Sequence, residues 1–313
     1  MAMSVPLVIT ARQYLLLKVL AHTFTGRHWR GLRENVRDIL ETHPGRIVSG
    51  WDASPGQFPY QASLRIRNSA GLLFGCGGSV IHQDWVITAA HCTANFVQVT
   101  VRAGLTQVHA AEYVADTWVW YNHFSFDSTT PTLVQPNDVS LVRVPYPMTF
   151  TVNLMSIQLQ TSNDAYRDYS NEQLMASGWG RTWTNGPTSD RLQWTYLRGL
   201  PDSECRRRFL TVANSATICA RFWNITSQSV CQGDSGGPLV HKNRWGVPTL
   251  IGITSFVASA RHGGCHSGLP AGFIRPGSFH AWYQQVTGLN LDFSRNAPTP
   301  NLIERLKTAH NLL

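Results

Sequence analysis

The segment Cys231–Pro238 constrains the fold of this chain more than any other part of the sequence. It reads Cys-Gln-Gly-Asp-Ser-Gly-Gly-Pro, so one serine lies among three glycines and directly follows an acid. Glycine permits backbone angles and close backbone approaches that other residues resist. A serine on such a turn can expose its hydroxyl beside backbone N–H donors, the arrangement of a nucleophile next to an oxyanion hole. The alternative, a glycine-rich surface turn, suits a bare Gly-x-Ser-x-Gly pattern but is disfavoured for the full octet.

Composition leaves room for a sizeable core and argues against two classes of function. The chain has 313 residues, of which 43% are apolar, enough for one large or two small domains. It contains no apolar run of about 18 residues, so no transmembrane helix is expected. The net charge is +8. Nucleic-acid binding is nevertheless not expected, because the basic residues cluster only at Arg206–Arg208.

The six cysteines indicate disulfides. None belongs to a Cys-x-x-Cys pair, so a zinc site is not expected. An even number of widely spaced cysteines fits three disulfides in an oxidising compartment, and the residues alone leave their pairing open. The cysteines are Cys76, Cys92, Cys205, Cys219, Cys231 and Cys265.

The first 46 residues divide into two segments. Residues 1–25 form a possible signal or leader, but Arg12 and Lys18 interrupt the apolar stretches. The segment is therefore either a poor signal sequence or a short leader of another kind. Residues 26–46 are basic and polar and end in Arg46, which the apolar pair Ile47-Val48 follows. This junction is either a processing point, which makes 26–46 an activation propeptide, or the start of an ordinary first strand.

The region 47–287 has the pattern of an all-β barrel or sandwich, because short apolar segments alternate with turns. These segments are Gln61–Arg67, Gly78–His82, Trp85–Ala89, Val97–Ala103, Val139–Val144, Leu174–Gly178 and Pro238–Val240. A helix is predicted at Pro276–Thr287. A shorter helix is predicted to start near Pro201–Ser203, with Asp202 or Ser203 as its cap. Residues 288–313 form a C-terminal extension that either docks on the body or frays.

A base and an acid for Ser235 can be chosen from their surroundings. His91 directly follows a predicted buried strand and directly precedes Cys92, whose disulfide would hold the imidazole rigidly. Asp138 enters an apolar strand, where a charged carboxylate is costly unless it is paired. Pairing with the Nδ1–H of an imidazole would satisfy the acid and set the tautomer of the base.

These residues carry a resemblance to a known family. The order His91, Asp138, Ser235 and four motifs are similar to the chymotrypsin-type serine proteases, over Ile47 to about Thr287. The narrower resemblance is to insect chymotrypsin-like or collagenase-like enzymes. The four motifs are Thr88–Cys92, Asp138–Leu141, Ser177–Gly180 and Gly233–Pro238.

The resemblance implies a fold and a mechanism. The implied fold is two packed six-stranded antiparallel β-barrels with a C-terminal helix, and the implied disulfides are Cys76–Cys92, Cys205–Cys219 and Cys231–Cys265. Ser235 is then the nucleophile, His91 the base and Asp138 its orienting acid, and the N–H groups of Gly233 and Ser235 form the oxyanion hole. It also implies a zymogen cut after Arg46, whose new Ile47 amine pairs with Asp234.

The resemblance also locates the substrate pocket. Ser229 would form the floor; because it is neutral, a basic P1 side chain would be buried without a counter-charge. The walls would be Ser255, Phe256, Val257 and Ala271, with Val257 narrowing the entrance. Small to medium apolar P1 side chains are therefore expected.

Three further expectations concern the surface and bound groups. The Asn224-Ile225-Thr226 sequence is a glycosylation acceptor that is either used or simply part of a surface loop. The segment after Gly104 lacks the acidic cluster of the family's calcium loop, since Gln107, His109 and Glu112 are its obvious polar candidates. No metal and no cofactor are expected.

The sequence thus predicts a secreted serine endopeptidase. Its expected partners are protein or peptide substrates, an activating trypsin-like protease and protein inhibitors. It is expected to be a monomer that binds neither nucleic acid nor membranes.

Two other interpretations compete with this one. A catalytically inactive homologue that acts as a binding protein is the main alternative, but such proteins normally lack a triad residue. A cascade protease with a regulatory amino-terminal domain is disfavoured, because the leader contains no cysteines for a disulfide-stapled module.

Overall fold

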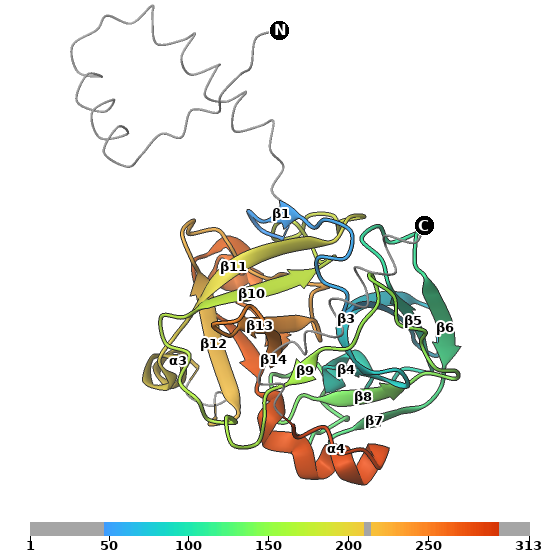
Figure 1. Cartoon of the computed structure of the whole chain (residues 1–313). Coiled ribbons are helices and arrows are strands. Elements are labelled where there is room, and N and C mark those ends of the chain that lie inside the picture. Colours follow the sequence, from blue (N-terminus) through green and yellow to red (C-terminus); the bar gives the residue numbers. More distant parts are fainter. Residues whose placement is uncertain (1–46, 210–213, 294–313) are drawn as a thin grey trace, which may run out of the picture. The chain divides into compact units, whose positions relative to one another are not determined.

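The computed structural model describes residues 47–209 and 214–293 (Figure 1). The predicted leader and propeptide, Arg46 included, and residues 294–313 of the C-terminal extension lie outside the described residues. Within those residues, no helix is long and apolar enough to cross a membrane.

The described chain contains strands joined by loops, a few 3-10 turns and two helices. The strands are β1 (Trp51–Asp52), β2 (Gln61–Arg67), β3 (Leu73–His82), β4 (Trp85–Thr88), β5 (Gln98–Ala103), β6 (Tyr113–Thr117), β7 (Trp120–Asn122), β8 (Ser140–Arg143), β9 (Gln158–Leu159), β10 (Gln173–Gly178), β11 (Gln193–Gly199), β12 (Thr217–Phe222), β13 (Pro238–Lys242), β14 (Pro248–Phe256) and β15 (Ala271–Ile274). The helices are α3 (Asp202–Arg208) and α4 (His280–Thr287), and the 3-10 turns are η1 (Ala90–Cys92), η2 (Ala260–His262), η3 (Gly264–His266) and η4 (Pro276–Phe279).

The first half of the protein is a curled antiparallel sheet of seven strands. Its order is β6-β5-β2-β3-β4-β8-β7, so β6 and β7 are edge strands. The sheet curls far enough for Thr117 Oγ1 to donate to Arg143 O over 2.7 Å and for Arg143 N to donate to Val119 O over 3.0 Å. These two bonds replace a β6–β8 ladder, so this half is an open sheet rather than the closed six-stranded barrel that was predicted.

The second half is a closed six-stranded antiparallel barrel. Its strands follow the order β11-β10-β13-β14-β15-β12, and the pairing of β12 with β11 closes it. The short strands β1 and β9 add to β11 and β14. Figure 1 shows the two halves side by side, with α4 at the lower edge. The prediction of an all-β fold with a C-terminal helix is therefore confirmed.

Alternation of side chains explains why these segments form strands around two cores. Every second residue of β5 and β11 is buried, the period of a sheet that is covered on one face. Fully buried Leu64, Ile87 and Leu141 pack inside the open sheet, and Leu239 and Phe273 pack inside the barrel. The core of the open sheet is continuous with part of the barrel, since Met175, Val240 and Leu250 belong to the same buried cluster as Leu64.

The two predicted helices are present, with one error in the capping. The predicted C-terminal helix begins as the 3-10 turn η4 and continues as α4, ending at Gly288, whose φ of 73° suits a helix C-cap. Helix α3 begins after Pro201, and neither Asp202 nor Ser203 caps it. The cap prediction is wrong because the Asp202 carboxylate instead accepts a hydrogen bond from the buried Arg275 guanidinium over 3.0 Å.

Candidate active site

Ser235 lies in the loop between β12 and β13, where the two halves of the protein meet. The φ angles of Gly233 and Gly236 are 99° and 77°, in the left-handed region that glycine adopts without strain. A Cβ at Gly236 would overlap Thr88 Oγ1 of the open sheet. The amide of Gly77 on β3 donates to the Ser235 carbonyl over 2.7 Å. The glycines therefore allow the open sheet to approach this loop closely and hold the serine backbone.

His91 and Asp138 are brought together by the pairing of two strands. His91 lies in η1 after β4, Asp138 lies just before β8, and β4 pairs with β8. The buried Asp138 carboxylate accepts from the His91 amide over 2.8 Å and contacts His91 Nδ1 at 2.7 Å. Ser255 Oγ on β14 donates to it over 2.6 Å. Because an ionised carboxylate only accepts, Nδ1 carries the proton and Nε2 is left as the base.

The charges of this pair support each other. Burial lowers the pKa of the His91 ring, but the Asp138 charge and their hydrogen bond raise it, and the net pKa lies above 6.5. Burial raises the pKa of Asp138, but the His91 charge and the hydrogen bonds from His91 and Ser255 bring it below 3.8. Asp138 is therefore ionised at neutral pH and stabilises a protonated His91.

A cavity of about 600 Å³ opens in front of His91 and Ser235. Within the described residues no hydrogen bond joins Ser235 Oγ to His91, whose Nε2 lies 3.8 Å from Cys92 Sγ. A small side-chain rotation is therefore needed to engage the hydroxyl, as is common in sites without substrate. The cavity is lined by Asn68, Phe74, His91, Ala94, Asn95, Phe96, Pro131, Thr132, Leu133, Val134, Asp138, Cys231, Gln232, Ser235, Thr254, Ser255, Phe256 and Val257.

The serine loop offers two backbone donors. The Asp234 amide donates to Cys231 O over 3.0 Å and closes a turn. In the parts of the chain that are described, the amides of Gly233 and Ser235 have no acceptor. Donors without an internal partner beside a serine hydroxyl are available to an oxyanion.

Asp234 is completely buried. Its carboxylate accepts from the amides of Gly180 and Cys231 over 2.8 and 2.9 Å. A Cβ at Gly178 or Gly180 would overlap this carboxylate, so both glycines are needed to admit it. Burial raises the pKa of Asp234 to about 6, although the two amide hydrogen bonds lower it. Among the described residues, Asp234 has no ion-pair partner.

The segment that follows the predicted cleavage point lies against the barrel. Ile47 is fully buried, and Val48 forms an antiparallel bridge with Ser229. The φ of Ile47 is 47°, a left-handed angle that a β-branched residue adopts only with strain, typically about 1–3 kcal/mol. The strained residue directly follows Arg46 in the sequence.

Three of the five predicted pocket residues line the cavity. Ser255, Phe256 and Val257 face it, whereas Ser229 and Ala271 are buried and lie outside its lining. Val257 packs against the core cluster of Ala271 and against the Cys231–Cys265 disulfide. Val257 therefore belongs both to the cavity lining and to the packing around the disulfide.

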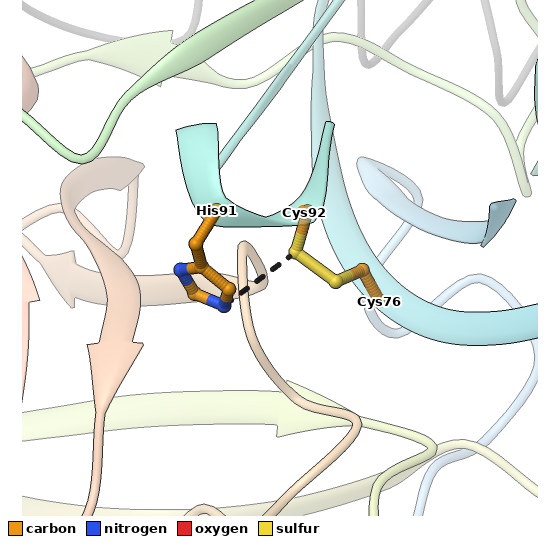
Figure 2. A group of neighbouring side chains, drawn as sticks. All are labelled: Cys76, His91 and Cys92. Atoms are coloured by element: carbon orange, nitrogen blue, oxygen red, sulfur yellow. Dashed lines mark hydrogen bonds between the residues drawn. A yellow bond between two sulfur atoms is a disulfide. The ribbon is translucent and has the colours of Figure 1, made fainter. Parts of the chain in front are cut away.

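The structure contains the three disulfides that the resemblance implied, Cys76–Cys92, Cys205–Cys219 and Cys231–Cys265. Figure 2 shows the first of them beside His91. The ligand atoms of Cys76, His91 and Cys92 lie within 4.8 Å of one another. Because the two sulfurs are bonded to each other, however, they are not the thiolates that a metal would need.

Two other predicted surface features can be located. Asn224 is exposed, so its acceptor sequence is accessible. In place of a calcium loop, Glu112 accepts hydrogen bonds from Thr151 Oγ1 over 2.5 Å and from Asn153 Nδ2 over 2.6 Å.

Some features of the site had no clear signal in the sequence. Ser255 was assigned only to the pocket wall, yet it also binds Asp138 from 117 positions away. The cavity walls Phe74, Phe96 and Leu133 come from three separate segments and form no motif. The segment Ser177–Gly180 did carry a signal of the Asp234 site. Glycines on both sides of a tryptophan indicate that another group approaches the backbone closely, and here that group is the Asp234 carboxylate.

Comparisons with known proteins match most of the chain. The sequence model of the family described as Trypsin matches residues 47–283. The chain is 35% identical over 252 residues to a collagenase of Hypoderma lineatum, covering 80% of this chain and 91% of that protein. It is 34% identical to Serine protease 1 of Drosophila melanogaster, covering 79% and 87%. A solved structure of HL collagenase superposes with a TM-score of 0.68 at 34% identity, covering 77% of this chain and 99% of that one.

Proposed function

This chain belongs to the trypsin family of serine proteases, and from this premise we propose that it is a secreted endopeptidase activated by cleavage after Arg46. Proteins or peptides are its substrates, a trypsin-like protease activates it, and protein inhibitors regulate it. The observation that carries the catalytic part is the buried Asp138 carboxylate bound to His91 Nδ1 at 2.7 Å, with Ser235 on the same cavity.

Each group has a defined role in peptide-bond hydrolysis. Ser235 Oγ attacks the scissile carbonyl carbon while His91 Nε2 takes the hydroxyl proton. The carbonyl oxygen becomes an oxyanion and accepts hydrogen bonds from the Gly233 and Ser235 amides, each typically worth roughly 3–4 kcal/mol. The intermediate collapses, the C–N bond breaks, and His91 returns the proton to the leaving amine. Water then repeats the sequence on the acyl-enzyme and frees Ser235.

Activation acts through the second buried acid. Cleavage after Arg46 creates a cationic amine on Ile47 and ends the constraint on its φ angle. The new amine pairs with Asp234, which has two amide donors but no cation among the described residues. Asp234 lies between the two oxyanion donors in sequence, so a fixed position for it orders both of them.

The pocket favours apolar P1 side chains of small to medium size. Neutral Ser229 is the proposed floor, and Val257 is the residue proposed to narrow the entrance. The packing of Val257 on the Cys231–Cys265 disulfide supports this role. A difference of one methylene in such a pocket changes binding by only about 1–3 kcal/mol, so we expect a preference rather than exclusion. Exposed Asn224 is the proposed glycosylation site.

The test is hydrolysis of a peptide series that differs only in P1, namely Arg, Ala, Val, Leu or Phe. The full chain is assayed before and after tryptic cleavage at Arg46, with Ser235→Ala as the control for residual trypsin. We expect activity only after the cut, and on apolar P1.

The other outcomes separate the parts of this proposal. Activity chiefly on Arg would exclude the Ser229 pocket and leave the triad in place. No activity on any peptide, with an intact Ile47 terminus, would favour a catalytically inactive binding homologue.

A further inference from the structure

Two arginines lie directly opposite each other on the outer face of the closed barrel. Arg198 on β11 and Arg221 on β12 are Cα partners in the antiparallel ladder. Like charges in this position repel each other and destabilise a sheet. The Nε atoms of both side chains are buried, and within the described residues neither has an acceptor. The barrel therefore holds two guanidinium groups together, and among the described residues the Nε donor of each is left without an acceptor.

Helix α3 extends this charge. Its last turn carries Arg206, Arg207 and Arg208, all exposed. Glu204, one helical turn before Arg208 and on the same face, lies 3.7 Å from Arg221 Nη1. We call Arg198, Arg206, Arg207, Arg208 and Arg221 the arginine surface. Among the described residues two acids lie close to it, Glu204 and Glu172, and Glu172 is already paired with Arg167 and His241. Asp202, on the same helix as Glu204, is paired with Arg275.

An aromatic ring and a polar cavity continue the arginine surface along β11. Tyr196 is two residues before Arg198, so both side chains point to the outer face of the barrel. Tyr196 also lines a cavity of about 290 Å³ together with Gln173, Met175, Glu172, His241 and Lys242. Gln173 is the Cα partner of Arg198 on β10. A guanidinium group, an aromatic ring and a side-chain amide thus lie next to one another on the outer face of the barrel.

We propose that the arginine surface binds an acidic polysaccharide, whose sulfate or carboxylate groups pair with the guanidinium groups. Arginine presents a planar fork that holds such oxyanions in a bidentate manner. The charge is spread over two strands and a helix, which suits a polymer better than a single small anion. The partly exposed Tyr196 ring, which also packs against Trp194 and Trp51, and the Gln173 amide add an apolar contact and hydrogen-bond partners for the hydroxyl groups of a sugar.

The position of this surface relates it to the cleft. Phe209 directly follows Arg208, and its ring packs edge-on against Phe256 at 5.0 Å between centroids. Phe256 lines the cavity in front of His91 and Ser235. A polysaccharide bound to the arginine surface therefore lies on the flank of the cavity that contains His91 and Ser235.

Binding is tested with a size-defined heparin oligosaccharide and the full chain, by titration at several NaCl concentrations. We expect Arg198→Gln/Arg221→Gln to raise Kd about 30-fold and to reduce the salt slope by about two. Arg206→Gln/Arg207→Gln/Arg208→Gln, at exposed positions, should have an equal or larger effect. Arg65→Gln/Arg143→Gln removes the same charge as the double variant at exposed positions on the open sheet and should change Kd less than twofold.

Two results would overturn the proposal. The first is an equal loss of heparin affinity in the control and the test variants, which would show that binding depends only on net charge. The second is equal competition by poly-L-glutamate or an oligothymidylate of matched charge, which would assign the surface to another class of polyanion. Unchanged peptide hydrolysis and thermal unfolding in the three arginine variants keep the binding result separate from folding and catalysis.

Discussion

Asp138 lies in the half of the protein built on the open sheet, and Asp234 lies in the half built on the closed barrel. Both carboxylates are almost completely buried. Asp138 has three donors, two of them from His91, which becomes cationic when it takes a proton, and the pKa of Asp138 falls below 3.8. Asp234 has two amide donors and no cation among the described residues, and its pKa rises to about 6. Asp138 already has its interaction partners in the uncut chain, whereas Asp234 lacks the positive charge that cleavage after Arg46 would create.

This difference indicates where regulation can act. A site whose catalytic pair is preformed can still be held inactive through the loop that carries the oxyanion donors. The following predictions test whether the two acids differ as their surroundings indicate.

Asp138→Asn should cause the largest loss. The amide would donate toward His91 Nδ1 and favour the tautomer with the proton on Nε2, so that the base can no longer accept one. We expect kcat of the cut enzyme to fall by roughly 10⁴-fold on an apolar-P1 peptide. Asp116→Asn, an exposed acid in the same half, is the matched control. A loss below tenfold would show that Asp138 does not set the tautomer.

Asp234→Asn should cause a smaller loss in the cut enzyme, because the triad remains and only the ordering of the oxyanion donors is affected. We expect kcat/KM to fall by roughly 10²- to 10³-fold. The control is Asp190→Asn, an exposed acid in the same half. Full activity of the variant after cleavage would contradict a role for Asp234 in activation.

The pH dependence of stability should differ between the uncut and cut chains. Between pH 3.8 and about 6 the native uncut chain binds more protons at Asp234 than the unfolded chain does. Its free energy of unfolding should therefore fall by about 3 kcal/mol as pH rises through this window and level off above it. Pairing with the Ile47 amine removes this slope. The measurement is chemical denaturation of both forms across this pH range in a Ser235→Ala background. If the free energy of unfolding has the same pH dependence in both forms, cleavage leaves the charge of Asp234 unpaired.

Ser255→Ala should have the smallest effect, because Asp138 retains both hydrogen bonds from His91. We expect a fall in kcat/KM of about tenfold or less. Since the carboxylate loses a donor that shares its charge, it should stabilise protonated His91 more strongly. The acidic limb of the kcat/KM profile should therefore move to higher pH. An unshifted profile would mean that Ser255 acts only as part of the cavity wall.

The chain's local patterns were sufficient for much of the fold. Short apolar segments between turns predicted β2, β5 and β10 nearly to their ends, because strands that pack on a core are rich in apolar residues. The spacing of apolar residues gave no information on whether the first sheet closes into a barrel. Closure depends on how the edge strand β6 contacts Arg143 on β8, which is distant in the chain. The helix cap at Asp202 was wrong because a distant buried arginine competes for its carboxylate.

What the sequence by itself determined is the set of reactive groups and the backbone that presents them. Glycines at 233 and 236 specify the turn of Ser235, and the apolar strand before His91 specifies its place at a sheet end. Only the tertiary structure decided which charges are balanced. Ser255 reaches Asp138 and Arg198 meets Arg221 across the fold, whereas Asp234 is buried away from any described cation. The free-energy cost of burying a carboxylate or a guanidinium depends on neighbours that are distant in the chain, so local sequence patterns do not reveal it.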